Sequence, residues 1–62
     1  MTKRYWTVVL EGKIVGDPLG QYGMLPVEVM AETAEEAEAV ALEQENDPSV
    51  VTELKVLFTR PS

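Results

Sequence analysis

The chain opens with a run of aromatic and β-branched residues. Tyr5 to Leu10 has the composition of a β-strand. Its apolar side chains fall on both faces, with Trp6, Val8 and Leu10 on one and Tyr5, Thr7 and Val9 on the other. A strand that is apolar on both faces is typical of the centre of a sheet.

Two further strands are predicted from the same alternation. In Met24 to Ala31, Pro26 cannot donate a ladder hydrogen bond, which predicts an edge strand. Ser49 to Thr59 predicts the last strand. Its expected faces are Val50, Thr52, Leu54, Val56 and Phe58 against Val51, Glu53, Lys55, Leu57 and Thr59.

The segment between the first two strands is rich in glycine. All four glycines lie from Gly12 to Gly23, and Gly16 to Gly20 has strong turn chemistry. We expect Ile14 and Val15 to extend the hairpin briefly before the turn. Long loops in small domains are often functional or mobile, so the Gly12–Gly23 loop is a candidate binding segment.

One helix is predicted from Thr33 to about Asn46. Thr33 to Glu36 form a capping box, in which the Thr33 hydroxyl accepts the Glu36 N–H and the Glu36 carboxylate accepts the Thr33 N–H. Asp47-Pro48 ends the helix, because the residue before proline avoids the helical region. The expected sheet-facing stripe is Ala34, Ala37, Val40, Ala41 and Gln44. Since most of this stripe is alanine, we expect Trp6 and Phe58 to supply the bulk of the core.

Handedness then determines the topology. The first two strands form an antiparallel pair, and the helix returns the chain so that the last strand is parallel to the second. A right-handed crossover that skips one strand places the third strand beside the first. The prediction is a single α+β domain, 1–62, of β-β-α-β type, with a three-stranded sheet of order 2-1-3 and one helix packed on one face.

Cysteine and histidine are both absent. The chain therefore has no disulfide and no thiolate metal site, and it lacks histidine, the commonest metal ligand. We expect no metal and no cofactor. A domain this small is marginal alone, which leaves association with a partner as its support. Because no signal-like or membrane-length apolar run is present, we expect a cytoplasmic protein that binds no membrane.

The net charge of −6 is concentrated in one segment. Residues 28–47 hold eight acids and neither lysine nor arginine. This balance argues against direct binding of nucleic acid, which needs basic residues, and permits a basic protein partner. Catalysis by a carboxylate needs an apolar or charge-coupled pocket, which solvated helix glutamates lack, so we do not expect an enzyme.

The run from Met24 to Gln44 joins a strand that ends in alanine to Thr33 and the Glu35-Glu36-Ala37 start of a helix. It resembles the strand-to-helix junction of HicB-like antitoxin domains and of many small phage and plasmid proteins. The tyrosine-containing strand and the Pro-Asp-Leu-Pro-Gly turn of the HicB group are missing. No functional residue is carried over, and no family is assigned.

We expect a small acidic protein–protein interaction module, an accessory or inhibitory protein of phage or plasmid type, that forms a homodimer through the sheet face without the helix or through an edge strand. One helix covers one face of the sheet, and the other face should expose residues from Tyr5, Thr7, Val9, Val51 and Leu57, or the residues that alternate with them. The helix is a second candidate surface, because Leu42 projects away from the apolar stripe among Glu35, Glu38, Glu43 and Glu45. Two alternatives are an acidic nucleic-acid mimic that blocks a basic protein, and a small-ligand-binding domain that uses the Gly12–Gly23 loop and Trp6.

Overall fold

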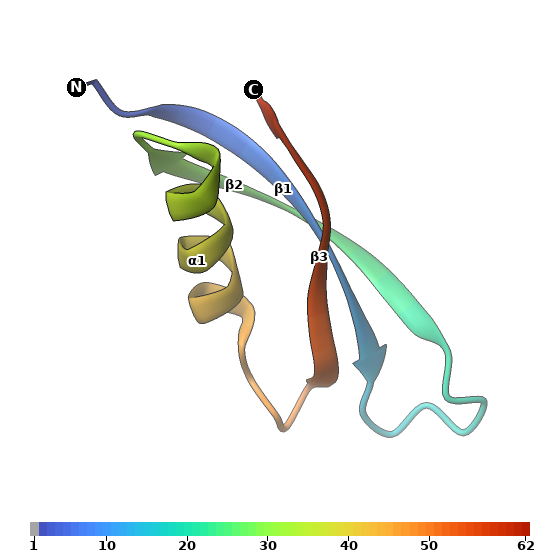
Figure 1. Cartoon of the computed structure of the whole chain (residues 1–62). Coiled ribbons are helices and arrows are strands. Elements are labelled where there is room, and N and C mark those ends of the chain that lie inside the picture. The colour runs from blue at the N-terminus through green and yellow to red at the C-terminus, as the bar shows by residue number, and fades with distance from the viewer. Residues whose placement is uncertain (1) are drawn as a thin grey trace.

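The computed structural model describes residues 2–62. The elements are β1 (Arg4–Ile14), β2 (Tyr22–Ala31), α1 (Ala34–Glu45) and β3 (Val51–Pro61). The sheet has the order β2-β1-β3, and β1 is antiparallel to both neighbours. The predicted α+β class, strand order and central position of the doubly apolar strand are confirmed, and Pro26 does lie in an edge strand. Figure 1 shows α1 on one side of the twisted sheet.

The hairpin between β1 and β2 is longer and its turn shorter than predicted. Gly12 and Gly23 are partners within the sheet, so only residues 15–21 connect the two strands. Asp17 holds this turn, since its Oδ1 accepts a hydrogen bond of 2.9 Å from the Leu19 N–H. Gly16 has a φ of 87°, a value that favours glycine.

The core lies between α1 and the sheet. The buried residues are Val8, Leu10, Val27, Val29, Ala31, Ala37 and Ala41. Because the helix contributes only alanines to this set, it lies close to the sheet and the strands supply the bulk. Trp6 packs against the core and donates from Nε1 to the Ala31 carbonyl at 3.0 Å, while the Arg4 guanidinium lies 5.3 Å from its ring centre. Trp6 therefore packs against the core as predicted, but it is only partly buried and does not belong to the buried cluster.

Only one of the two predicted capping hydrogen bonds is present at the start of α1. The Thr33 hydroxyl accepts the Glu36 N–H at 3.2 Å. The Glu36 carboxylate, however, accepts the Glu32 N–H at 3.2 Å, so the predicted bond to the Thr33 N–H is wrong by one residue. Because β2 ends at Ala31, the Glu32 N–H makes no hydrogen bond within the sheet and can donate to the Glu36 carboxylate.

The register of β3 differs from strict alternation. Val9 pairs with Phe58, but Leu10 pairs with Val56, so Leu57 is an extra residue in the ladder. Val56 packs against the core and Thr59 bonds α1, which puts both Leu57 and Phe58 on the opposite face. Phe58 is 53% exposed, so its predicted core position is wrong.

A second irregularity lies between Glu11 and Lys13 of β1, where the partner residues are Lys55 and Thr52. Glu53 lies in this stretch with a φ of 55°. Val51 follows as the partner of Ile14 on the helix side of the sheet. The prediction that Val51 lies on the face of the sheet opposite the helix is therefore wrong.

The helix covers only part of the sheet. Its 12 residues span about 18 Å, whereas strands of 10 or 11 residues span about 33–37 Å. Figure 1 shows α1 beside the end of the sheet that carries both termini, with the β1–β2 turn at the far end. The helix side of the sheet near that turn has no helix above it.

Candidate protein-interaction site

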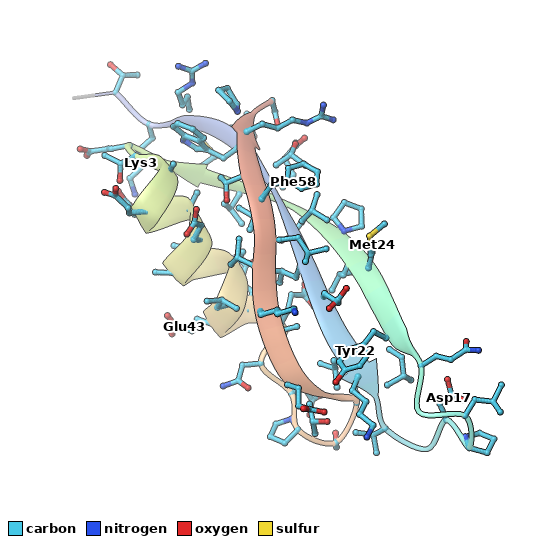
Figure 2. All side chains as sticks on the ribbon, turned by 45° about the vertical axis from the view of Figure 1, so that its right-hand side comes forward. Lys3, Asp17, Tyr22, Met24, Glu43 and Phe58 are labelled. Carbon is cyan, nitrogen blue, oxygen red and sulfur yellow. The ribbon has the colours of Figure 1, made fainter. Side chains whose placement is uncertain are left out.

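The face of the sheet opposite α1, here called the helix-free face, is built from alternate residues of each strand. They are Tyr5, Thr7, Val9, Glu11 and Lys13 of β1, Tyr22, Met24, Pro26, Glu28 and Met30 of β2, and Thr52, Glu53, Lys55, Leu57, Phe58 and Arg60 of β3. Figure 2 shows Phe58, Met24 and Tyr22 on this side, away from the helix that carries Glu43.

An apolar patch occupies the middle of the helix-free face. Val9 is only 8% exposed although no helix covers it, because its partners Pro26 and Phe58 flank it on the two neighbouring strands. Around it, Met24 is 70% exposed and Leu57 is 40% exposed. Tyr5 and Met30, which pair with each other, extend the exposed apolar surface toward the chain termini. Methionine and aromatic side chains are the types that are enriched at protein interfaces.

The charged groups of the helix-free face balance one another. Its three bases are Lys13, Lys55 and Arg60, and its three acids are Glu11, Glu28 and Glu53. Lys55 pairs with Glu11 at 3.3 Å, and the Tyr22 hydroxyl donates to the Glu53 carboxylate at 3.3 Å. The remaining eight acids and two bases therefore carry the whole net charge of −6.

Both edges of the sheet are poor templates for another strand. Pro26 removes one N–H from the edge of β2. On β3, the two register shifts and the positive φ of Glu53 break the regular row of hydrogen-bonding groups. Proline and bulges are the devices by which proteins prevent pairing at an edge. Neither edge therefore offers a regular row of hydrogen-bonding groups to another strand.

The predicted helix surface is only partly available. Glu35 and Glu43 are exposed, but the Glu38 carboxylate accepts a hydrogen bond of 2.9 Å from the Thr59 hydroxyl. Leu42 is partly buried and packs against the core, so the prediction that it projects away from the sheet is wrong.

The sheet-facing stripe of α1 is rotated from its predicted position, since Gln44 is exposed. Alanines form the centre of the contact, and the larger Val40 and Leu42 pack from either side. Leu42 lines a shallow hollow with Leu54 of β3. Because the apolar stripe consists mostly of alanine, the sequence pattern defines the rotation of the helix about its axis only weakly.

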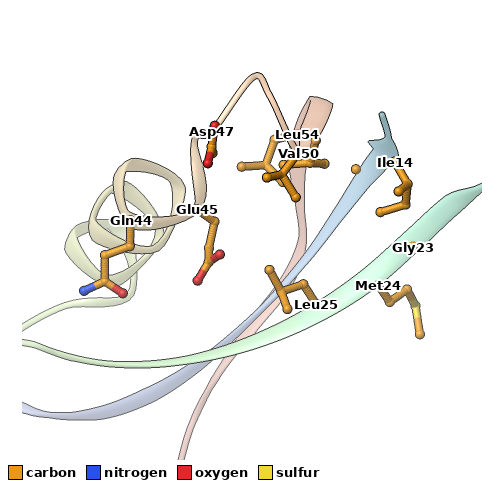
Figure 3. A pocket seen from close by; sticks show the side chains of 11 residues that line it. Ile14, Gly23, Met24, Leu25, Gln44, Glu45, Asp47, Val50 and Leu54 are labelled. Carbon is orange, nitrogen blue, oxygen red and sulfur yellow. The ribbon is translucent and has the colours of Figure 1, made fainter. Parts of the chain in front are cut away.

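A cavity of about 430 Å³ lies beyond the end of α1. Its lining residues are Gly12, Ile14, Gly23, Met24, Leu25, Gln44, Glu45, Asp47, Val50, Val51 and Leu54. Figure 3 shows Gln44, Glu45 and Asp47 on its helix side and Ile14 away from them. Trp6 pairs with Val29 and Pro61 near the opposite end of the sheet, so the structure does not bring it together with the glycine-rich hairpin.

Among residues 2–62, no three His, Cys, Asp or Glu side chains are grouped to hold a metal ion. Two hydrogen bonds from Ser49 to the Asp47 carboxylate lower the pKa of that group, but Asp47 is fully exposed. Within the same residues, no helix is long and apolar enough to cross a membrane.

The sequence pattern predicted Tyr5, Val9 and Leu57 on the helix-free face but did not identify Met24 and Phe58 as candidate contact residues. Met24 was open to inference, because it alternates with the core residues of β2. Phe58 was not, since its orientation depends on the extra residue at Leu57. A comparison of the chain with protein-family models, with curated proteins and with solved structures finds no match.

Proposed function

We propose that this chain is a small protein–protein interaction module that forms a homodimer through the helix-free face. The observation that carries the proposal is the exposed apolar patch of Met24, Leu57 and Phe58 around the buried Val9. A monomer rarely leaves a continuous apolar surface in water unless that surface binds something. The protein would act by binding rather than by catalysis, as an accessory or inhibitory component.

Charge supports a second copy as the occupant of this face. Two helix-free faces can meet without net repulsion because each carries equal numbers of acids and bases. Contact between two helix surfaces would instead oppose clusters of like charge. Small size supports the same occupant, since a chain of 62 residues buries little apolar surface by itself.

The test is analytical ultracentrifugation of matched aspartate variants over a concentration series. Phe58→Asp places a charge on the helix-free face, whereas Leu19→Asp makes an equivalent change at a side chain that is 76% exposed in the β1–β2 turn. Wild type and Leu19→Asp should be dimers at high micromolar concentration, and Phe58→Asp should be a folded monomer by circular dichroism. A wild-type chain that sediments only as a monomer would refute the proposal, as would equal effects of the two variants.

A second candidate function is an acidic mimic of nucleic acid that blocks a basic protein. It is favoured by α1, which has acids in its first turn and no base in its last turn. Such a partner should bind through exposed glutamates such as Glu35 and Glu43, with affinity that falls steeply as salt rises. Lysine at Glu43 and Glu45 should abolish that binding and leave the dimer intact, which separates this function from the first.

A further inference from the structure

The cavity beyond α1 exists because the sheet is longer than the helix that covers it. Gly12 and Gly23 are side-by-side partners that line the cavity and, as glycines, place no side chain in it. The side chains of Val51 and Leu54 lean over Gly12, and that of Ile14 leans over Gly23. The body of the cavity is therefore aliphatic.

The helix side of the same cavity is negative. Glu45, at the last position of α1, and Asp47 line it there, as Figure 3 shows. The last turn of α1 holds no base, so the partial negative charge of the helix C-terminus is not neutralised from within the helix. Among residues 2–62, neither carboxylate has an ion pair. The Asp47 carboxylate accepts two hydrogen bonds, both from Ser49.

We infer that this cavity binds a small organic cation with an apolar tail, such as a primary alkylammonium or arylalkylammonium ion. The ammonium group would lie against Glu45 and Asp47, and the tail would lie among Leu25, Val51 and Leu54. A volume of about 430 Å³ is within the usual range of about 300–1,000 Å³ for small-molecule sites. The site lies on the helix side of the sheet, and Met24 is the one lining residue that it shares with the helix-free face.

The test is a methyl NMR titration of the full chain with 4-phenylbutylammonium and with its neutral analogue, 4-phenylbutan-1-ol. The cation should produce saturable shifts at the methyl groups of Ile14, Leu25, Val51 and Leu54. The alcohol should bind roughly two- to thirtyfold more weakly, the range expected for two exposed ammonium–carboxylate contacts. Equal binding of the two compounds, or no saturable shift, would overturn the inference.

Two isosteric variants locate the charge effect. Glu45→Gln combined with Asp47→Asn keeps the shape of the cavity and should reduce binding of the cation to that of the alcohol. Glu43→Gln removes one charge from the same helix at a residue that does not line this cavity, and binding should be unchanged. Shifts confined to the methyl groups of Val9, Met30 and Leu57, none of which lines the cavity, would mean that the compound binds the helix-free face and would also overturn the inference.

Discussion

Replacement of Gly12 by alanine tests whether the side chains near the hairpin end are packed as described. Gly12 is buried in the central strand, and a Cβ there would collide with a γ-methyl of Val51 and lie 3.1 Å from Leu54 Cδ1. The backbone itself does not require glycine, because Gly12 is not among the residues with positive φ. The sign of the effect is therefore set by packing alone.

The magnitude follows from two opposing terms. Overpacking of this kind costs about 1–3 kcal/mol, and the lower entropy of an unfolded chain with alanine returns about 0.4–1 kcal/mol. The expected net loss is about 1–2 kcal/mol. For a domain of this size that corresponds to a decrease in Tm of about 5–15 °C.

Gly23, the partner of Gly12 in β2, provides the matched control. Its added Cβ would lie 3.3 Å from Ile14 Cδ1, the end of a side chain that is 43% exposed and can move. Gly23→Ala should therefore be neutral or stabilising in a thermal melt. In the Gly12→Ala background, Val51→Ala should recover stability, so the double variant should lose less than the sum of the two single changes. An additive pair, or a Gly12→Ala variant as stable as wild type, would refute the described packing.

Three further predictions concern local hydrogen bonds. Thr33→Ala should lower the unfolding free energy by about 1 kcal/mol in a denaturant titration, because the Glu36 N–H loses its acceptor, whereas Thr33→Ser should not. Trp6→Phe should cost about 0.5–1.5 kcal/mol more than the lost ring area accounts for, since the indole N–H bond disappears. The pKa of Asp47 is below its ordinary value of 3.8, so its bonds from Ser49 stabilise the fold above that pH and are lost as the pH falls below it. By NMR titration, Ser49→Ala should raise this pKa, and the difference in stability between the two chains should vanish at low pH; an unchanged pKa would contradict the assignment.

The sheet could be predicted from sequence because its determinants are local. Pro26 indicates an edge strand in any context, and the run from Tyr5 to Leu10 is apolar on both faces whatever lies beside it. Thr33 likewise marks the helix start through its own hydroxyl. Each of these features acts within one strand or one helical turn, so the folded structure was not needed to read it.

The orientation of side chains on β3 could not be predicted in the same way. The extra residue at Leu57 is a bulge in the pairing of β3 with β1, and no residue pattern within Ser49 to Thr59 indicates it. One inserted residue moves all later positions to the opposite face. Phe58 therefore lies on the same face as Val9 and not on the face of Val8 and Leu10. The apolar patch that carries the proposed function therefore depends on a contact between residues about fifty positions apart.

The small core and the apolar patch are connected through Val9. The two largest side chains that are fully buried are Val8 and Leu10, and the helix adds only alanines to them. Val9 lies between these two residues on the other face, where only Pro26 and Phe58 shield it. A second copy on that face would enclose Val9 and put the central strand between two apolar layers, the usual environment of a strand apolar on both faces. In this arrangement the same contact would complete the fold and form the dimer, so stability and association should rise together with protein concentration.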